Sequence, residues 1–147
     1  MGKIRVAIAG IGNCASSLIQ GIEYYKKLGD RHPDRYLGLM HYDLGGYKPS
    51  DIQFVAAFDI DRRKVGRPLK EAVFSRPNCT KVFNREVPDY PVRVQMGKVL
   101  DGLAPHMKDY PDDRRFIVSG KKPCNVSQAM KRAGADILIS YMPVGSE

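Results

Sequence analysis

Long apolar runs and paired cysteines are both missing from this chain of 147 residues. No stretch approaches the roughly 18 consecutive apolar residues of a membrane-spanning helix, and the apolar run near the N-terminus ends in glycines rather than in a cleavage site. Cys14, Cys79 and Cys124 are far apart and show no C-x-x-C spacing, which argues against a disulfide framework and against a zinc knuckle. We therefore expect a cytoplasmic protein with reduced thiols, no membrane contact and no metal site.

The charge is positive but scattered. Lysine and arginine outnumber the acidic residues by 24 to 16, for a net charge of +8. Such a charge suits a nucleic-acid surface and an anionic small molecule equally well. The basic residues form short clusters, such as Arg62-Arg63-Lys64, which we expect on solvated faces, and no DNA- or RNA-binding module is recognisable. A nucleic-acid partner is therefore the least favoured alternative.

The N-terminal segment predicts a strand, a tight turn and a helix. Residues 4–9 (IRVAIA) are mostly apolar, and apolar residues recur at helical spacing from Ala15 onward. Between them Gly10, Gly12 and Ala15 make the G-x-G-x-x-A form of the dinucleotide-binding fingerprint, in which Gly12 lets the backbone approach a pyrophosphate. The N–H groups at the start of the helix would face the phosphates. The alternative is a glycine turn that only packs the helix against the sheet.

A carboxylate ends the second predicted strand, which spans residues 53–59. Asp59 follows Gly12 by 47 positions, and leaving out a 24-residue loop excursion at 27–50 reduces this to 23, close to the roughly 20 expected for the acid that binds the adenine ribose. A carboxylate there favours NAD over NADP, although the adjacent Arg62 and Arg63 weaken that preference. For Asp61 we expect a helix N-cap. The excursion suggests a flap or an interface segment.

Further elements alternate along the rest of the chain, although residues 75–87 follow no pattern that we can assign. The predicted elements are a short helix from Arg62, a second helix begun by Pro68, a strand at 92–95, a helix carrying Leu100 to Met107, an edge strand at 116–118, a helix at 125–133 stopped by Gly134, and a strand at 136–141. This order predicts an α/β, Rossmann-like, doubly wound and mainly parallel sheet. Loops at the carboxyl ends of its strands should bring residues 140–146 close to residues 10–14 and Asp59.

Five segments, in order, resemble the archaeal and bacterial myo-inositol-1-phosphate synthases (inositol-3-phosphate synthases). They are GIGNCASSLIQGIEYY (10–25), GLMHYDLGGY (38–47), FVAAFDIDRRKVG (54–66), VQMGKVLDG (94–102) and SYMPVGSE (140–147). The resemblance implies an NAD-dependent isomerase that converts D-glucose 6-phosphate to 1L-myo-inositol 1-phosphate. It matches Gly10, Gly12, Asn13 and Cys14 to the pyrophosphate loop of that family, Asp59 to the ribose acid, and Ser140, Tyr141 and Pro143 to the loop that flanks the cofactor.

Members of that family are considerably longer, and their catalytic lysines come after the S-Y-x-P-V-G-S-E segment. We therefore expect residues 1–147 to be the N-terminal part of an NAD-binding Rossmann domain, with a sheet that is incomplete on its C-terminal side and exposes an apolar edge. The catalytic and oligomerisation parts would be absent, and the chain alone inactive. It would associate as a homo-oligomer or with the missing segment. The alternative is a stand-alone NAD-binding or regulatory module without catalysis.

Overall fold

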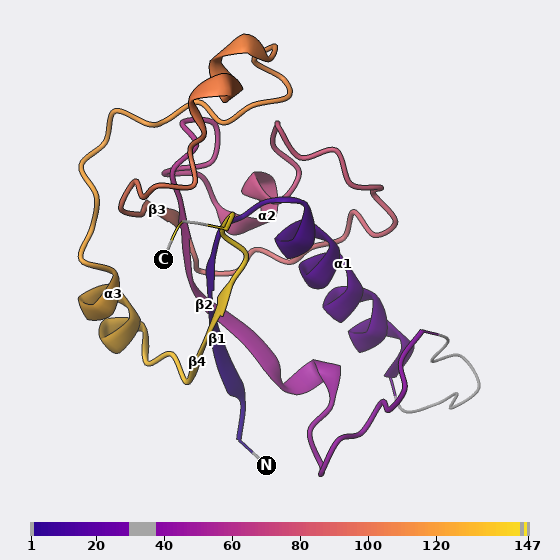
Figure 1. Cartoon of the computed structure of the whole chain (residues 1–147). Coiled ribbons are helices and arrows are strands. Elements are labelled where there is room, and N and C mark those ends of the chain that lie inside the picture. Colours follow the sequence, from indigo (N-terminus) through magenta and orange to yellow (C-terminus); the bar gives the residue numbers. More distant parts are fainter. Residues whose placement is uncertain (1, 30–37, 145, 147) are drawn as a thin grey trace.

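Four parallel strands form the centre of the computed structural model, which describes residues 2–29, 38–144 and 146. The strands are β1 (Ile4–Ala9), β2 (Ile52–Asp59), β3 (Val94–Met96) and β4 (Ile137–Ser140). Their spatial order is β3-β2-β1-β4, and all three pairings are parallel (Figure 1). This is the order of the first four strands of a doubly wound sheet, so the predicted Rossmann-like α/β fold is confirmed.

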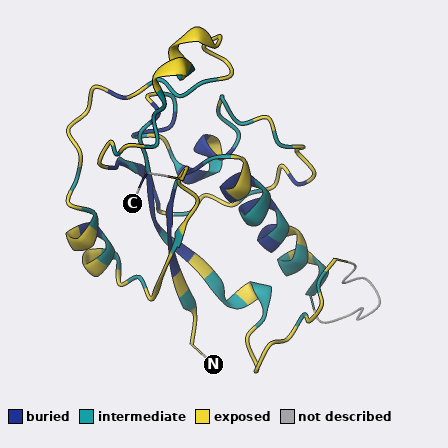
Figure 2. Cartoon of the chain, viewed as in Figure 1, coloured by how far each residue is buried: buried dark blue, intermediate teal, exposed yellow. Residues whose placement is uncertain are grey.

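Alternating side chains of β1 serve two cores, one on each face of the sheet. Val6 and Ile8 belong to a large apolar cluster with helix α1 (Asn13–Leu28) and helix α2 (Leu69–Ala72). Ala7 belongs to a smaller cluster with helix α3 (Val126–Ala133). Successive side chains of a strand point to opposite faces, so helices cover both sides of the sheet (Figures 1 and 2).

Polar caps and glycines set the helix ends much as the sequence predicts. The Asn125 side chain accepts the N–H of Gln128 at 3.0 Å and caps α3, and Gly134, with a φ of 60°, ends it. Pro68 directly precedes α2. The short helix predicted from Arg62 is wrong, because residues 62–66 form consecutive turns and Gly66 has a φ of 89°.

The segment 75–87 runs along α1, held by side chains of that helix. Asn13 Oδ1 accepts the two N–H groups of residues 79–80 at 2.8 and 3.0 Å, and Gln20 Oε1 accepts those of residues 83–84 at 2.9 and 3.1 Å. Residues seven apart lie on one face of a helix, so Asn13 and Gln20 form a polar stripe along α1. This stripe accepts the backbone N–H groups of the segment, which has no neighbouring strand among the described residues to accept them.

The predicted helix carrying Leu100 to Met107 is wrong. The chain there has a turn at residues 101–102 and then the 3₁₀ helix η4 (Pro105–Asp109). Gly102 lies so close to Ser146 that a Cβ on it would come within 1.8 Å of the serine Oγ. Tertiary contact and the interior proline thus override the helical spacing of the apolar residues. The edge strand predicted at 116–118 is reduced to one antiparallel bridge between Asp61 and Val118.

Part of the predicted excursion, residues 30–37, lies outside the described residues. Its later part carries a small antiparallel bridge between Leu44 and Tyr47 and ends in the 3₁₀ helix η3 (Pro49–Asp51), which leads into β2. In the described part of the chain, no helix has both the length and the apolar character needed to cross a bilayer.

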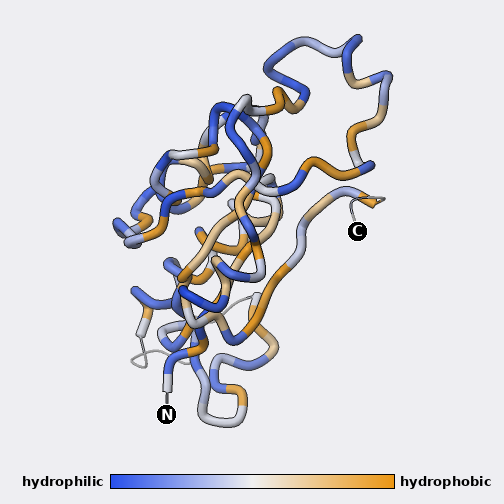
Figure 3. The backbone as a smooth tube through the Cα atoms, turned by 90° about the vertical axis from the view of Figure 1, so that its left-hand side faces the viewer, coloured by the Kyte–Doolittle hydropathy of each residue, from blue (hydrophilic) through white to orange (hydrophobic). Residues whose placement is uncertain are grey.

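The outer strand β4 presents an apolar edge, as expected. Ile137 and Leu138 are 48% and 42% exposed. Figure 3 shows the hydrophobic colouring of this strand as it runs toward the C-terminal end of the chain.

Candidate dinucleotide-binding site

A cavity of about 840 Å³ lies at the carboxyl ends of the parallel strands. Seven of the eight residues that the resemblance assigns to the cofactor line it: Gly10, Gly12, Asn13, Cys14, Asp59, Tyr141 and Pro143. The eighth, Ser140, lies within β4 opposite Ala9 and does not line the cavity. The turn after β1, the end of β2 and the segment after β4 thus meet around one space, at the edge of a doubly wound sheet where ligands bind.

Gly10 allows the segment after β4 to approach β1 closely. Its φ is 87°, and a Cβ on it would lie 2.9 Å from the carbonyl oxygen of Tyr141. The Gly10 N–H donates to the carbonyl of Phe58 at 2.9 Å, and the Tyr141 N–H donates to that of Ala9 at 2.8 Å. A glycine is therefore required here for two independent reasons, its backbone conformation and the close contact.

Gly12 borders open space instead. It precedes α1 with a φ of −89°, and a Cβ on it would have no neighbouring atom within 4 Å. The first hydrogen bond of α1 runs from the N–H of Ser16 to the carbonyl of Gly12, so the N–H groups of residues 13–15 have no acceptor within the helix. The first turn of α1 carries no acidic residue. These N–H groups and the positive end of the helix dipole therefore meet the cavity beside Gly12, an arrangement that fits a pyrophosphate.

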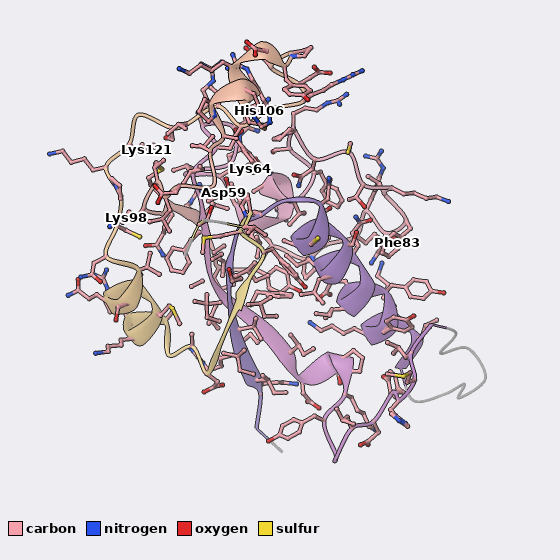
Figure 4. The ribbon with its side chains drawn as sticks, viewed as in Figure 1. Asp59, Lys64, Phe83, Lys98, His106 and Lys121 are labelled. Atoms are coloured by element: carbon pink, nitrogen blue, oxygen red, sulfur yellow. The ribbon has the colours of Figure 1, made fainter. Side chains whose placement is uncertain are left out.

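The backbone of Ile11, between the two glycines, is hydrogen-bonded to three polar side chains: Asp59, Lys64 and Asn78. Its N–H donates to Asp59 Oδ2 at 2.7 Å. Its carbonyl oxygen accepts from Lys64 Nζ at 2.6 Å and from Asn78 Nδ2 at 3.1 Å. Figure 4 shows Asp59 and Lys64 near the start of α1. Both peptide groups of Ile11 are thus fixed by side chains distant in sequence.

The carboxylate of Asp59 has two further backbone partners. Its Oδ1 accepts the N–H groups of Ile60 and Asp61 at 2.7 and 2.8 Å. A carboxylate offers about four acceptor positions, so three backbone bonds leave room for about one more donor. Asp59 therefore organises the turn and has limited capacity left for a ligand.

The buried Asp61 pairs with the partly exposed Arg63 next to the site. Arg63 donates to both carboxylate oxygens of Asp61, at 2.8 Å from Nε and 2.6 Å from Nη2, and the N–H of Ile117 donates to Asp61 at 3.0 Å. Burial alone would raise the pKa of Asp61, but these donors together hold that pKa below its usual value. Asp61 accepts the N–H of Arg63 at 2.8 Å, but the residues after it form a turn, so the predicted helix N-cap at Asp61 is wrong.

Neither arginine after β2 is placed to hold a ligand in the cavity. Besides Asp61, the Arg63 guanidinium donates to the carbonyl oxygens of Asp112 and Arg115. Arg62 is exposed and does not line the cavity. These two arginines therefore give little reason to expect binding of the 2′-phosphate of NADP.

Lys64 is fully buried, so the expectation of a solvated lysine was wrong. Besides Ile11, its ammonium donates to Asn78 Oδ1 at 2.7 Å. Burial lowers the pKa of Lys64, and the nearby carboxylates of Asp59 and Asp61 oppose that shift. No local pattern distinguishes Lys64 from the two arginines before it, which is why the sequence did not reveal it.

Asn13 and Cys14 contribute in different ways. The Asn13 side-chain oxygen accepts the N–H groups of residues 79–80, and its Nδ2 donates to the sulfur of Cys79 at 3.5 Å. Its backbone N–H and the second hydrogen of Nδ2 are therefore the donors it can offer a ligand. Cys14 is exposed.

Three exposed basic side chains that the sequence did not single out also line the cavity: Arg76, Lys98 and Arg114. The described residues contain no group of three or more potential metal ligands.

Comparisons with known proteins point to one group of enzymes. No family model matches the chain. It is 45% identical over 146 residues to inositol-3-phosphate synthase of Mycolicibacterium smegmatis and 47% identical over 144 residues to that of Corynebacterium glutamicum. These matches cover 99% and 98% of this chain but 38% of each relative. The chain thus spans well under half the length of the curated relatives it matches.

Solved structures agree on the fold. The crystal structure of Ari2 matches with a TM-score of 0.74 and 30% identity over 96% of this chain and 38% of that one. A myo-inositol-1-phosphate synthase-related protein from Thermotoga maritima matches with a TM-score of 0.60 and 19% identity over 95% of this chain and 34% of that one, a likeness of fold alone.

Proposed function

We propose that this chain, which is homologous to the inositol-3-phosphate synthases, binds NAD in the cavity beside Gly12. It would form the nucleotide-binding region of an enzyme that converts D-glucose 6-phosphate to 1L-myo-inositol 1-phosphate. One observation carries the proposal: the open space beside Gly12, the N–H groups that begin α1 and the carboxylate of Asp59 meet at one cavity.

The pyrophosphate would be held by backbone rather than by side chains. In the proposal it accepts the N–H groups of Gly12, Asn13 and Cys14, and the missing Cβ of Gly12 lets its oxygens come close. Exposed basic groups on the cavity wall, among them Arg76 and Arg114, add attraction for the phosphates. Bound NAD would supply the acceptor and later the donor of a hydride, so that the overall isomerisation has no net change in oxidation state.

Asp59 would accept one ribose hydroxyl at its remaining lone pair. The same negative charge repels a 2′-phosphate, and the guanidinium of Arg63 is occupied elsewhere. The proposed site would therefore bind NAD in preference to NADP. Tyr141 and Pro143 would flank the cofactor, while Ser140 would fix the start of their loop through β4.

Glucose 6-phosphate turnover would need more than these 147 residues. The resemblance puts the catalytic lysines after the S-Y-x-P-V-G-S-E segment, so we assign no catalytic residue here. The exposed apolar side chains of β4 suit association with a further polypeptide segment or with a second copy.

Calorimetric titration tests the proposal. We expect the purified chain to bind NAD at least tenfold more tightly than NADP and to form no inositol phosphate from glucose 6-phosphate. The absence of NAD binding would remove the proposed function. Inositol phosphate formed by the chain itself would show that catalytic groups are present in it. A different result would favour a binding module: the chain binds NAD, but it does not turn over glucose 6-phosphate even when combined with the remaining part of a relative.

A further inference from the structure

The buried ammonium of Lys64 touches the backbone of the phosphate-binding turn itself. It lies 2.6 Å from the carbonyl oxygen of Ile11, the residue between Gly10 and Gly12. Lys64 is fully buried and comes from the turns after β2, 53 residues further along the chain. A charge in this position is costly, because an ammonium loses its hydration when it is buried.

Packing alone does not explain the lysine. The apolar stem of a lysine could be replaced by methionine, and Asn78 already provides a neutral donor to the same carbonyl at 3.1 Å. What the lysine adds is a positive charge and a shorter bond. Asp59 and Asp61 are close enough to affect its titration, so the charge is compensated within the fold.

The peptide geometry links this contact to the ligand side of the turn. A trans peptide group is planar, and its carbonyl and N–H point in opposite directions. With the Ile11 carbonyl drawn inward to Lys64, the N–H of Gly12 must point away from the buried side. Gly12 lines the cavity and Ile11 does not, so that N–H faces the cavity.

We infer that Lys64 is a positioning residue for phosphate binding: through its hydrogen bond to Ile11 it holds the Ile11–Gly12 peptide group with its N–H toward a bound diphosphate. The inference rests on the proposed function. Lys64 itself does not touch the ligand. Its removal should therefore weaken binding of the phosphates and leave binding of the adenosine part unchanged.

The test compares ADP with adenosine, two ligands that differ only in the diphosphate. In Lys64→Met the ratio of their affinities should fall about tenfold, as expected for losing the alignment of a charge-assisted hydrogen bond. Lys64→Arg, which keeps the charge and the donors, should restore most of the ratio. Val73→Ala, which weakens the same core but removes no hydrogen-bond partner of Ile11, should leave the ratio unchanged. An equal ratio in the unaltered chain and in folded Lys64→Met would overturn the inference.

A second measurement needs no variant and covers the case in which Lys64→Met does not fold. The ¹⁵N resonance of Lys64 Nζ in the unaltered chain should shift when ADP is added and stay in place with adenosine. An unchanged resonance at saturating ADP would overturn the inference while the proposed function stands. If the unaltered chain binds neither ADP nor NAD, the proposed function fails and the inference fails with it.

Discussion

Asp59 accepts the backbone N–H of Ile11 at 2.7 Å, so the carboxylate at the end of β2 is bonded directly to the turn that begins α1. The two features that the sequence connected only by their spacing are therefore one structural unit. Asp59 has a structural role that is visible without any ligand, and its proposed ribose contact comes in addition.

Replacing Asp59 should affect both stability and binding. In Asp59→Asn only one oxygen remains, so the side chain can accept at most two of the three backbone N–H groups that Asp59 accepts. We expect a loss of about 1–3 kcal/mol in the free energy of unfolding and at least tenfold weaker NAD binding. Chemical denaturation and calorimetry measure the two effects. Asp136→Asn is the matched control, since Asp136 also accepts a backbone N–H, that of Arg5 at 2.8 Å, but does not line the cavity. Equal NAD affinity in both variants would remove Asp59 from the site.

Gly10→Ala should destabilise the fold. The substitution puts a Cβ at a φ of 87° and 2.9 Å from the Tyr141 carbonyl, which belongs to backbone and cannot turn aside. We expect a loss of about 2 kcal/mol or more in the free energy of unfolding, measured by urea denaturation. A variant as stable as the unaltered chain would contradict the close approach of β1 and the segment after β4.

Gly12→Ala should show the opposite balance. Alanine accepts a φ of −89°, and its methyl group would meet no protein atom within 4 Å, so the free energy of unfolding should change by no more than about 1 kcal/mol. NAD binding should weaken by at least tenfold, because the methyl group takes the space proposed for the pyrophosphate. Unchanged affinity in a stable Gly12→Ala variant would argue for a glycine turn that only packs the helix.

The buried Asp61 predicts how stability depends on pH. A carboxylate whose pKa is lowered by folding stabilises the protein above its unfolded pKa, and that contribution is lost as the pH falls through the folded pKa. Asp61→Asn should therefore be less stable than the unaltered chain at pH 7, and the gap between the two should narrow below about pH 4. Urea midpoints from pH 7 to pH 3 measure the gap. A gap that stays constant over this range would contradict the lowered pKa.

The stripe along α1 can be tested at Gln20. This side chain is fully buried, and its removal leaves the N–H groups of residues 83–84 without an acceptor, so Gln20→Ala should cost about 2–4 kcal/mol. It should also open the segment 79–86 to limited proteolysis. The control is Gln128→Ala, on the exposed face of α3. It should change the free energy of unfolding by no more than about 0.5 kcal/mol and leave the cleavage pattern unchanged. Similar behaviour of the two variants would contradict the stripe.

Elements with local signals could be predicted from the sequence. The strands β1, β2 and β4 are indicated by apolar runs, and α3 by its polar cap and Gly134. These features depend on residues within a few positions of one another. The convergence of the turn, Asp59 and Tyr141 on one cavity could be predicted from the fold class, because parallel strands place their carboxyl ends at one edge.

Features that depend on distant residues could not be predicted. The path of residues 75–87 is set by side chains of α1 that lie more than 60 positions away. Lys64 looked like a surface lysine because its partners, Ile11 and Asn78, are separate in the sequence. The helix expected from Leu100 failed because Gly102 packs against Ser146, a contact that periodicity does not reveal.

The proposed NAD site can be tested without any substitution, by mapping the amide resonances that NAD shifts in the ¹⁵N-labelled chain. We predict the largest shifts at Gly12, Asn13 and Cys14, smaller shifts at Ile60 and Tyr141, and none in α2, which serves as an internal control because none of its residues lines the cavity. Saturating NAD that leaves the amides of residues 12–14 unmoved would contradict the assignment of this turn as the dinucleotide site.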